Sequence, residues 1–498
     1  MSLSPLLEYA ERERLAAASK LSTQNQAKLG QYFTPVTTAQ LIAKMAELHQ
    51  SGTIRVLDPG AGSGILTAAL VNRILKETTS LKVEVLAIET DTQLIRHLET
   101  TLNACINAGH GRVKASWVNA DFILDSTGLN HSLNLEKKFD LVIENPPYGK
   151  LGVKDTKRIA MRSRGEDAPN LYTAFLSLSI DALCSDGQLV AITPRSFFNG
   201  SYFKDFRFQF LDNIALRKIH VFSSRSSIFS DSGVLQENVI FQGIRGAQHL
   251  PVVLSESADE NTRVTSRIID YEDVIFPNDP HRFIRLPLGV SDAEATDVIL
   301  NQPCSLEDLG IQVSTGKVVD FRFRDSLCDS EHPDAAPLIY PGNLRNGTVD
   351  WPRDIRKPQW FIPTNDKARK MLLPQGWYTL VKRFSAKEER RRVVASTWSP
   401  EQYPSNVAFE NHLNIFHSNN QGIDEKLAKG IAVWMNSTFI DKFFRTFSGH
   451  TQVNATDLRT LRFPSRETLR SLGQKNPQSQ QYIDEAVMEL TINDRAKQ

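Results

Sequence analysis

Short apolar runs alternate with segments of helical period between about Ile54 and Ile240. The runs have the length and the β-branched content of buried strands, and the segments between them have the spacing of amphipathic helices. Strands that alternate with helices in this way predict an α/β fold with a parallel, doubly wound sheet. The expected strands cover residues 54–58, 83–89, 113–118, 139–144, 188–193, 216–222 and 237–243.

The same pattern predicts helices over residues 64–77, 93–107 and 171–184. We expect the last two strands of the series to form an antiparallel hairpin that closes the sheet.

Beyond about residue 290 the pattern changes to short β-like runs separated by Pro, Gly and Asn turns, as in LIYPGNLRNGTVDWP. This change predicts a second, α+β domain, whereas the stretch before it could belong to either domain. The expected organisation is a helical arm over 1–29, an α/β domain over 30–245, a connecting segment over 246–289, the second domain over 290–465 and a polar tail over 466–498.

Composition narrows the class of protein only a little. The chain has 498 residues, 58 Lys and Arg against 57 Asp and Glu, and four cysteines without a C-x-x-C pair. The near-zero net charge gives no hint of a nucleic-acid partner, although basic residues can still gather on one face. Scattered cysteines favour neither zinc nor disulfides, so no metal is expected. Without an apolar run long enough to span a bilayer, we expect a cytoplasmic protein with no membrane partner.

The first motif is VLDPGAGSGILT, residues 56–67. A strand ends at Asp58, and Gly60, Gly62 and Gly64 then form a tight turn into a helix, where a ligand can approach the backbone. The turn lacks the Gly-Lys-Ser/Thr of a phosphate-binding loop and the third glycine of a dinucleotide fingerprint. An acidic residue before the glycines would suit a cationic amino-acid ligand.

The second motif is a pair of acids at successive strand ends. Glu89 ends the second expected strand and Asp121 follows the third. In open α/β sheets ligands bind at the carboxyl ends of the strands, where an acid can accept both ribose hydroxyls. Asp121 alone would be read as an ordinary cap, but in series with the glycine turn it predicts an acceptor for an adenine amine, with Phe122 stacking on the ring.

The third motif is Asn145-Pro146-Pro147-Tyr148, directly after the fourth strand. Two prolines stop the strand and fix the backbone. The Asn145 oxygen and the Pro146 carbonyl are well placed to accept the two N–H bonds of an exocyclic amine, which frees the lone pair of that amine for attack. Tyr148 offers a ring for stacking, worth about 1–3 kcal/mol per base. Such stacking helps to offset the cost of flipping a base out of a duplex.

The order GQYFTP (30–35), DPGAGSG (58–64), Glu89 and Asn-Pro-Pro-Tyr (145–148) resembles the γ class of S-adenosylmethionine-dependent DNA adenine-N6 methyltransferases of type II restriction–modification systems. The resemblance covers about residues 22–245. It implies a Rossmann-like methyltransferase sheet followed by a C-terminal target-recognition domain that binds DNA.

The resemblance also implies roles for individual residues. Residues 32–35 would close over the methionine end of the cofactor, with Thr34 contacting its carboxylate, and Asn170 would support the catalytic pocket. Phe229 would supply a second aromatic ring on the target base, unless it lies in the core. The implied catalytic residues are Asn145, Pro146, Pro147, Tyr148 and Phe229, and the implied cofactor residues are Tyr32, Phe33, Thr34, Pro35, Asp58, Gly60, Gly62, Gly64, Glu89, Asp121, Phe122 and Asn145.

Three segments are candidates for nucleic-acid contact. They are the basic loop 149–169, the basic run KRFSAKEERRR (382–392) and the polar run TFSGHTQVN (446–454). A basic run is often only a solvated face, and sequence alone does not separate phosphate contacts from base contacts.

The sequence thus predicts a monomeric enzyme that methylates adenine N6 in double-stranded DNA and is paired with a cognate restriction endonuclease. Two alternatives stay open at this point. One is methylation of a protein glutamine or of an RNA base, since similar turns serve those reactions. The other is a non-catalytic DNA-binding modification subunit.

Overall fold

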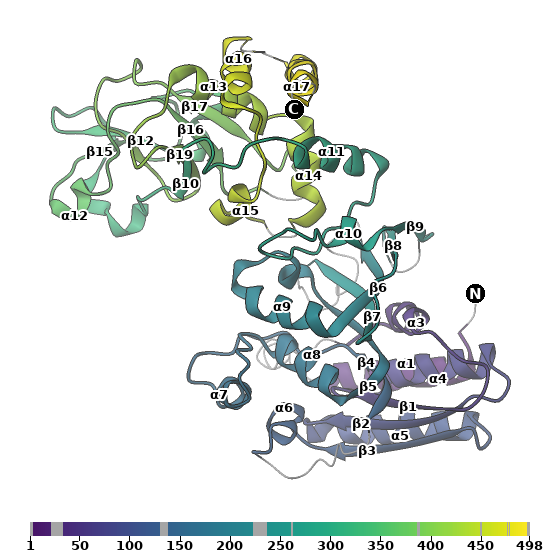
Figure 1. Ribbon diagram of the computed structural model, residues 1–498. Coiled ribbons are helices and arrows are strands. Elements are labelled where there is room, and N and C mark those ends of the chain that lie inside the picture. The colour runs from purple at the N-terminus through teal and green to yellow at the C-terminus, as the bar shows by residue number, and fades with distance from the viewer. Residues whose placement is uncertain are drawn as a thin grey trace. The chain divides into compact units, whose positions relative to one another are not determined.

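The chain folds into two compact units, Met1–Leu288 and Gly289–Gln498 (Figure 1). The computed structural model describes residues 3–20, 33–129, 138–222, 237–259, 262–385, 389–448, 451–475, 477 and 479–495. Each unit has a hydrophobic core of its own. The boundary between the units lies close to residue 290, where the pattern of apolar and polar residues changes.

The first unit is built on a nine-stranded sheet with the order β3-β2-β1-β4-β5-β7-β6-β8-β9. The strands from β3 to β5 are parallel, and β7 is antiparallel to both of its neighbours. All the strands predicted from the apolar runs are present. Their bounds are β1 Thr53–Asp58, β2 Lys82–Glu89, β3 Val113–Asn119, β4 Phe139–Glu144, β5 Leu183–Pro194, β6 Ile214–Phe222 and β7 Asn238–Arg245.

The β6–β7 pair is antiparallel, as predicted, but it does not close the sheet. Strand β8 (Val252–Ser257) pairs in parallel with β6, and β9 (Thr265–Ile269) pairs with β8. Residues 246–288, whose domain the sequence left open, therefore belong to the first unit. Their apolar side chains, such as Val252 and Ile284, are fully buried there.

Helices flank this sheet in two groups, as the crossover connections of a doubly wound sheet require. Helices α1, α3, α4 and α5 pack against one another, and α6, α8 and α9 form the second group (Figure 1). No helix of the described residues is both long enough and apolar enough to cross a membrane. The helices are α1 Pro5–Lys20, α3 Val36–Met45, α4 Ile65–Glu77, α5 Thr92–Ala108, α6 Phe122–Ser126, α7 Thr156–Ser163, α8 Leu171–Ala182, η1 Arg195–Phe198, η2 Ser201–Phe203, α9 Lys204–Asn213 and α10 Tyr271–Val274.

The predicted N-terminal arm is helical, and it packs onto the first unit. Helix α1 lies against α4 and α5, where Leu7 and Ala10 are fully buried. A 2.7 Å contact between Glu13 Oε2 and His97 Nδ1 also joins α1 to α5.

The second unit contains both helices and strands, as predicted, and its strands form two sheets. The six-stranded sheet has the order β10-β19-β16-β17-β14-β13, and the four-stranded sheet has the order β11-β15-β12-β18. The strands are β10 Gln312–Thr315, β11 Leu327–Cys328, β12 Ala336–Ile339, β13 Leu344–Arg345, β14 Thr348–Val349, β15 Trp360–Phe361, β16 Tyr378–Lys382, β17 Ala395–Trp398, β18 Ala408–Phe409 and β19 Leu413–His417. The helices are α11 Val290–Leu300, η4 Asp320–Arg322, η5 Arg324–Ser326, η6 Pro341–Asn343, α12 Asp366–Arg369, α13 Glu425–Met435, α14 Thr438–Phe447, α15 Ala455–Arg459, α16 Arg466–Lys475 and α17 Gln480–Arg495.

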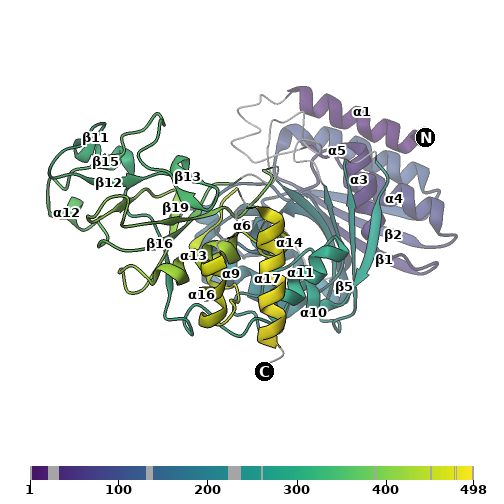
Figure 2. The same cartoon turned by 90° about the horizontal axis from the view of Figure 1, so that it is seen from above.

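The segment 466–498, which the sequence suggested was a polar tail, instead forms helices α16 and α17. Both helices pack within the second unit beside α13 (Figures 1 and 2). The composition misled because few apolar side chains of this segment are buried among the described residues, namely Leu469, Leu472, Ala486 and Val487. The backbones of α13 and α16 also pack closely. A Cβ at Gly430 of α13 would overlap the carbonyl oxygen of Leu469 of α16.

We expect Gly430→Ala to destabilise the second unit. Alanine favours a helix over glycine by about 1 kcal/mol. The added methyl group would nevertheless force α16 away from α13, and such overpacking costs about 1–3 kcal/mol. Thermal unfolding should show a lower midpoint for this variant. Gly152→Ala is the control, because a Cβ there meets nothing within 4 Å; equal midpoints in the two variants would contradict this packing.

Candidate active site

The glycine turn after β1 needs positive backbone angles that glycine adopts without strain. Gly62 has φ of 56° and Gly64 has φ of 85°. Gly64 is also the N-cap of α4, and a Cβ there would lie only 3.1 Å from the side chain of Leu98. A side chain at either position would therefore distort the start of α4.

Glu89, at the end of β2, is joined to this turn. Its carboxylate accepts hydrogen bonds from the backbone N–H groups of Gly62 and Asp91, both at 2.8 Å. The side chain is nearly buried, and this burial raises its pKa. A carboxylate with two N–H donors still has lone pairs for further donors, such as a pair of hydroxyl groups.

Asp121, after β3, caps the short helix α6. Its Oδ1 accepts from the N–H groups of Ile123 and Leu124, each at 3.1 Å. Its Oδ2 lies 2.7 Å from Nζ of Lys157, which comes from α7. Asp121 is thus both an ordinary cap and a partner of a lysine that the sequence did not single out.

These strand ends surround a cavity of about 460 Å³. Its size lies in the range typical of small-molecule sites. The segment after the Asn-Pro-Pro-Tyr turn contributes further residues to the cavity wall, namely Gly149, Lys150, Leu151, Asp155 and Lys157. Helix α8 contributes Leu171 and Phe175. The sequence-predicted residues on its wall are Phe33, Gly60, Gly62, Glu89, Asp121, Phe122, Asn145 and Pro147.

Asp58, also predicted at the cofactor, lies behind the glycine turn and not on the cavity wall. It is fully buried, and its Oδ2 accepts a 2.8 Å hydrogen bond from the hydroxyl of Thr67. Its Oδ1 has no hydrogen-bond partner among the described residues. Burial raises the pKa of this carboxyl to about 7. Gly64, Thr34 and Pro35 likewise lie off the cavity wall.

The Asn-Pro-Pro-Tyr turn begins where β4 ends, at the carboxyl edge of the sheet. The Asn145 side chain donates through Nδ2 to the hydroxyl of Thr34 at 2.9 Å. Its Oδ1 accepts a 3.1 Å hydrogen bond from the hydroxyl of Tyr148. The amide is therefore oriented from both of its ends, and Thr34 reaches it from a segment 111 residues earlier in the chain.

Tyr148 is largely buried, with 8% of its surface exposed. Its ring meets the ring of Tyr172 edge to face at a centroid distance of 6.4 Å. Its hydroxyl also lies 3.4 Å from the carbonyl oxygen of Ile192. Asn170, the N-cap of α8, forms an isolated bridge with Lys150 beside this turn. Two other predicted residues, Tyr32 and Phe229, lie outside the described residues.

Sequence reasoning missed two features of the site. It named the basic loop 149–169 only as a candidate for nucleic-acid contact, and it did not foresee that Lys150 and Lys157 of this loop line the cavity. It also read Glu144 only as the end of a strand. Glu144 is fully buried, accepts from Ser179 at 3.1 Å, and burial raises its pKa to about 8. An acidic residue inside the apolar run FDLVIE was the available signal for it.

The fold and the site together define a class of protein. A doubly wound sheet that ends in a glycine turn, two acids and an Asn-Pro-Pro-Tyr turn around one cavity is the arrangement of an S-adenosylmethionine-dependent methyltransferase.

Comparison with known proteins narrows this class. The family model described as Eco57I restriction-modification methylase matches residues 65–229. The type II methyltransferase M.PstI of Providencia stuartii is 41% identical over 92% of this chain and 91% of its own length. The type II methyltransferase M.BsuBI of Bacillus subtilis is 37% identical over 99% of both chains. The chain therefore belongs to the type II methyltransferases of restriction–modification systems.

A solved structure shares the fold of both units. The type IIL restriction–modification enzyme MmeI, solved in complex with DNA, aligns with a TM-score of 0.53 at 13% identity. The alignment covers 97% of this chain and 73% of that one.

Proposed function

We propose that the chain transfers a methyl group from S-adenosylmethionine to N6 of adenine at specific sites in double-stranded DNA. The observation that carries this proposal is the position of Asn145. Its amide lines the same cavity as Glu89 and Asp121, and Thr34 orients it. Methylation there, in the cytoplasm, would protect host DNA from a cognate restriction endonuclease.

The orientation of the Asn145 amide suits an amine as the methyl acceptor. Because Nδ2 donates a hydrogen bond to Thr34, the amide oxygen is the atom of this side chain that can accept from an incoming N–H group. The carbonyl of Pro146 is a second rigid acceptor, since prolines fix the backbone on both sides of it. Two acceptors on the two N–H bonds of an adenine amine would draw the nitrogen toward tetrahedral geometry and free its lone pair.

Preorganised dipoles of this kind act without reorganisation during the reaction. When bound, S-adenosylmethionine supplies a methyl group made electrophilic by its sulfonium. The chain then has to hold the amine in line with that methyl group, which is a task of positioning. The proton of the amine leaves to solvent after the transfer, so no side chain of the turn needs to act as a general base.

Tyr148 occupies the place that the adenine amine would take. Its hydroxyl donates to Asn145 Oδ1 at 3.1 Å, and an amine bound to that oxygen would replace this donor. The ring would then turn its face to the adenine, with stacking worth about 1–3 kcal/mol.

We assign the cofactor to the cavity of about 460 Å³. Glu89 would accept the two ribose hydroxyls, and Asp121 with Phe122 would hold the adenine ring. The backbone of Gly60 and Gly62 would border the methionine end. Asp58 and Gly64, behind the turn, would support it and not touch the cofactor.

The Asp121 carboxylate already pairs with Lys157 at 2.7 Å. An adenine amine would share this carboxylate with the lysine, so α7 would lie against the bound cofactor.

The chain would act as a monomer, because one unit supplies both the catalytic amide and the cofactor groups. The DNA would extend beyond this unit, and we assign target recognition to the second unit. Methylation of a protein glutamine or of an RNA base is the alternative chemistry, since both substrates also present an amine. The large second unit favours DNA over these smaller targets.

Labelled-methyl transfer tests this proposal directly. The purified chain with labelled S-adenosylmethionine is given duplex DNA, RNA or a protein extract in parallel, and we expect label only in duplex DNA. Sequencing of DNA from cells that express the chain should then place N6-methyladenine at one short sequence. Label in RNA or protein, or methylated cytosine in the DNA, would reject the proposal.

We expect Glu89→Ala to weaken binding of S-adenosylmethionine on the order of 10- to 100-fold, since a hydrogen bond to a charged group contributes about 1.5–3 kcal/mol. Equilibrium dialysis measures this without any turnover. Glu84→Ala is the matched control, because Glu84 lies on the same strand but is about half-exposed and forms its ion pair with Lys114, away from the cavity wall. Equal affinity in the two variants would remove Glu89 from the ribose site.

A further inference from the structure

Three strands of the second unit bring distant loops to one edge of its larger sheet. Strand β19 lies between β10 and β16 and is antiparallel to both (Figure 1). The amino end of β19 therefore meets the carboxyl ends of β10 and β16. We call the loops at this place, residues 316–322, 383–385, 410–412 and 451–452, the β19 edge.

Backbone hydrogen bonds hold these loops together. Gly316 N–H donates to Leu413 O at 2.8 Å, and Arg383 N–H donates to His412 O at 2.8 Å. The segment around Gln452 joins them, because Ser385 N–H donates to Thr451 O at 2.9 Å and Phe384 bridges to Gln452. The basic run 382–392 and the polar run 446–454 thus meet at this edge.

The side chains of the β19 edge carry donors and an open aromatic ring. His412 has 47% of its side chain exposed, and its Nδ1 lies 2.7 Å from the buried carboxylate of Glu410. This contact holds the imidazole beside Glu410 while about half of the ring stays exposed. Phe384 is 39% exposed and packs edge to face on His412 at 4.7 Å. The guanidinium of Arg383 lies 6.0 Å from the Phe384 ring. It also donates through Nη1 to Asn411 O at 3.2 Å and through Nη2 to Gln452 Oε1 at 3.4 Å, which uses two of its five N–H groups.

A second group lies beside these residues. Phe321 is 63% exposed, and Arg322 lies 5.5 Å from its ring. Asp320, next to Phe321, is paired with Lys357 at 2.6 Å. Its charge is therefore compensated, and the cations Lys317, Arg322 and Arg383 leave the β19 edge net positive.

Arg392, in the densest basic run of the sequence, has a structural role. Only 1% of it is exposed. Its guanidinium donates to the backbone oxygen of Ser385 and to the hydroxyl of Ser448 at 2.9 Å. Arg392 thus stabilises the loop that carries Arg383 and Phe384. Because its guanidinium is buried, we do not assign it to a phosphate.

We propose that the β19 edge reads the base sequence of the DNA, with Arg383, Phe384 and His412 at the base edges. This assignment rests on the proposed function. The donors of an arginine suit the acceptors of guanine in the major groove, an exposed imidazole nitrogen can accept from or donate to a base edge, and an aromatic ring suits a thymine methyl group or an unstacked base. The positive charge of the edge suits the phosphates on either side.

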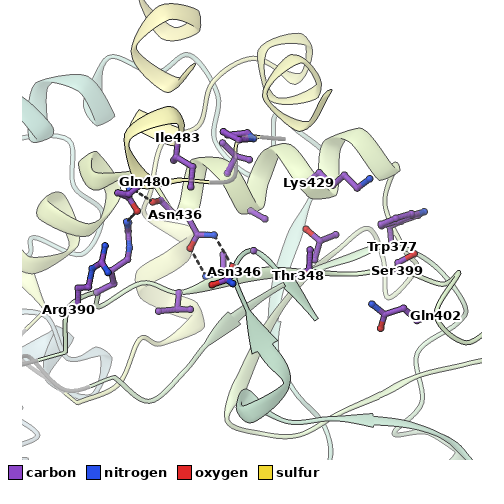
Figure 3. A pocket seen from close by; sticks show the side chains of 18 of the residues that line it. Asn346, Thr348, Trp377, Arg390, Ser399, Gln402, Lys429, Asn436, Gln480 and Ile483 are labelled. Carbon is purple, nitrogen blue, oxygen red and sulfur yellow. Dashed lines mark hydrogen bonds between the residues drawn. The ribbon is translucent and has the colours of Figure 1, made fainter. Parts of the chain in front are cut away.

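A cavity of about 680 Å³ in the second unit has a different character (Figure 3). Its polar groups are largely bonded to one another. Asn436 exchanges two hydrogen bonds with the backbone of Ala395, and Arg391 donates to Gln480. Lys429 in this cavity lies 4.9 Å from the ring of Trp377. It is a matched control for Arg383, because each is a cation beside an aromatic ring.

The test compares binding to two duplexes with the full chain. The first duplex carries the sequence that the wild type methylates in cells, and the second carries the same bases scrambled. For Arg383→Ala, Phe384→Ala and His412→Ala we expect binding to the first duplex to weaken tenfold or more. Binding to the scrambled duplex should change by less than about threefold, because base contacts specify and phosphate contacts do not. Lys429→Ala should bind both duplexes as the wild type does.

Sequencing of DNA from cells expressing Phe384→Ala should also show methylation at sites that depart from the wild-type sequence at one position. A loss of fold alone would not produce such a shift, and binding of S-adenosylmethionine checks the first unit in each variant. Equal losses on both duplexes, or no loss on either, would overturn the assignment. If the wild type methylates DNA but the variants keep its sequence specificity, only the assignment of base reading to the β19 edge is wrong. If the wild type methylates no DNA, the proposed function fails with it.

Discussion

Asn145→Ala should lose methyl transfer by a factor on the order of 100 to 1,000, the usual effect of removing one preorganised polar group from a reaction site. The reason is geometric. The Asn145 amide is oriented by Thr34 at 2.9 Å and by Tyr148 at 3.1 Å, and alanine leaves no acceptor for the amine at this place. The measurement is kcat with a short duplex that contains the methylated sequence, at saturating cofactor.

Binding of S-adenosylmethionine should persist in this variant, because Glu89, Asp121 and Phe122 remain in place. Asn213→Ala is the control, since Asn213 is exposed at the end of α9 and its side chain donates to the backbone oxygen of Gln209. Turnover of Asn145→Ala within about threefold of the control would exclude the amide as the acceptor, because a preorganised group should contribute more. A parallel loss of cofactor binding would instead assign Asn145 to the cofactor.

The second large effect concerns Tyr148, where two substitutions separate the ring from the hydroxyl. Tyr148→Ala removes the ring, and we expect a loss in kcat/KM of about 10- to 100-fold, the equivalent of the 1–3 kcal/mol that stacking contributes. Tyr148→Phe keeps the ring, and we expect it to stay within a few-fold of the wild type. The phenylalanine variant would also leave Asn145 Oδ1 without its internal donor.

Steady-state kinetics on the same duplex measures both variants. A large loss in Tyr148→Phe would mean that the hydroxyl itself takes part in the reaction. Normal turnover in Tyr148→Ala would show that the Tyr148 ring does not contribute to the reaction by stacking on the base. Because Tyr148 also packs on Tyr172, thermal unfolding of both variants should accompany the kinetics.

The sequence predicted the elements at the carboxyl edge of the first sheet well, and the reason is local. Strand β4 is an almost continuous apolar run, and the chemical groups lie at or just after the ends of their strands, as Glu89 ends β2 and Asn145 follows β4. The positions of these groups are therefore set by the strand order alone. That order places Glu89, Asp121 and Asn145 on the wall of one cavity.

Contacts between distant segments were not predictable in the same way. Nothing in the local pattern shows that Lys157 pairs with Asp121, because more than thirty residues, which include α6 and β4, separate them. Asp58 looked like a ligand group because of its place before the glycines, yet its side chain turns back toward Thr67. Helix α16 was hidden because it packs through the backbone at Gly430, and a glycine leaves no hydrophobic signal.

The spacing of strands in the second unit sets how much DNA the β19 edge can span. Neighbouring strands lie about 4.8 Å apart, so the loops that leave β10 and β16 on either side of β19 are separated by about 10 Å. A duplex rises about 3.4 Å per base pair. In the proposed DNA complex the β19 edge would therefore face about three consecutive base pairs, and a longer recognition sequence would require contacts from another part of the chain.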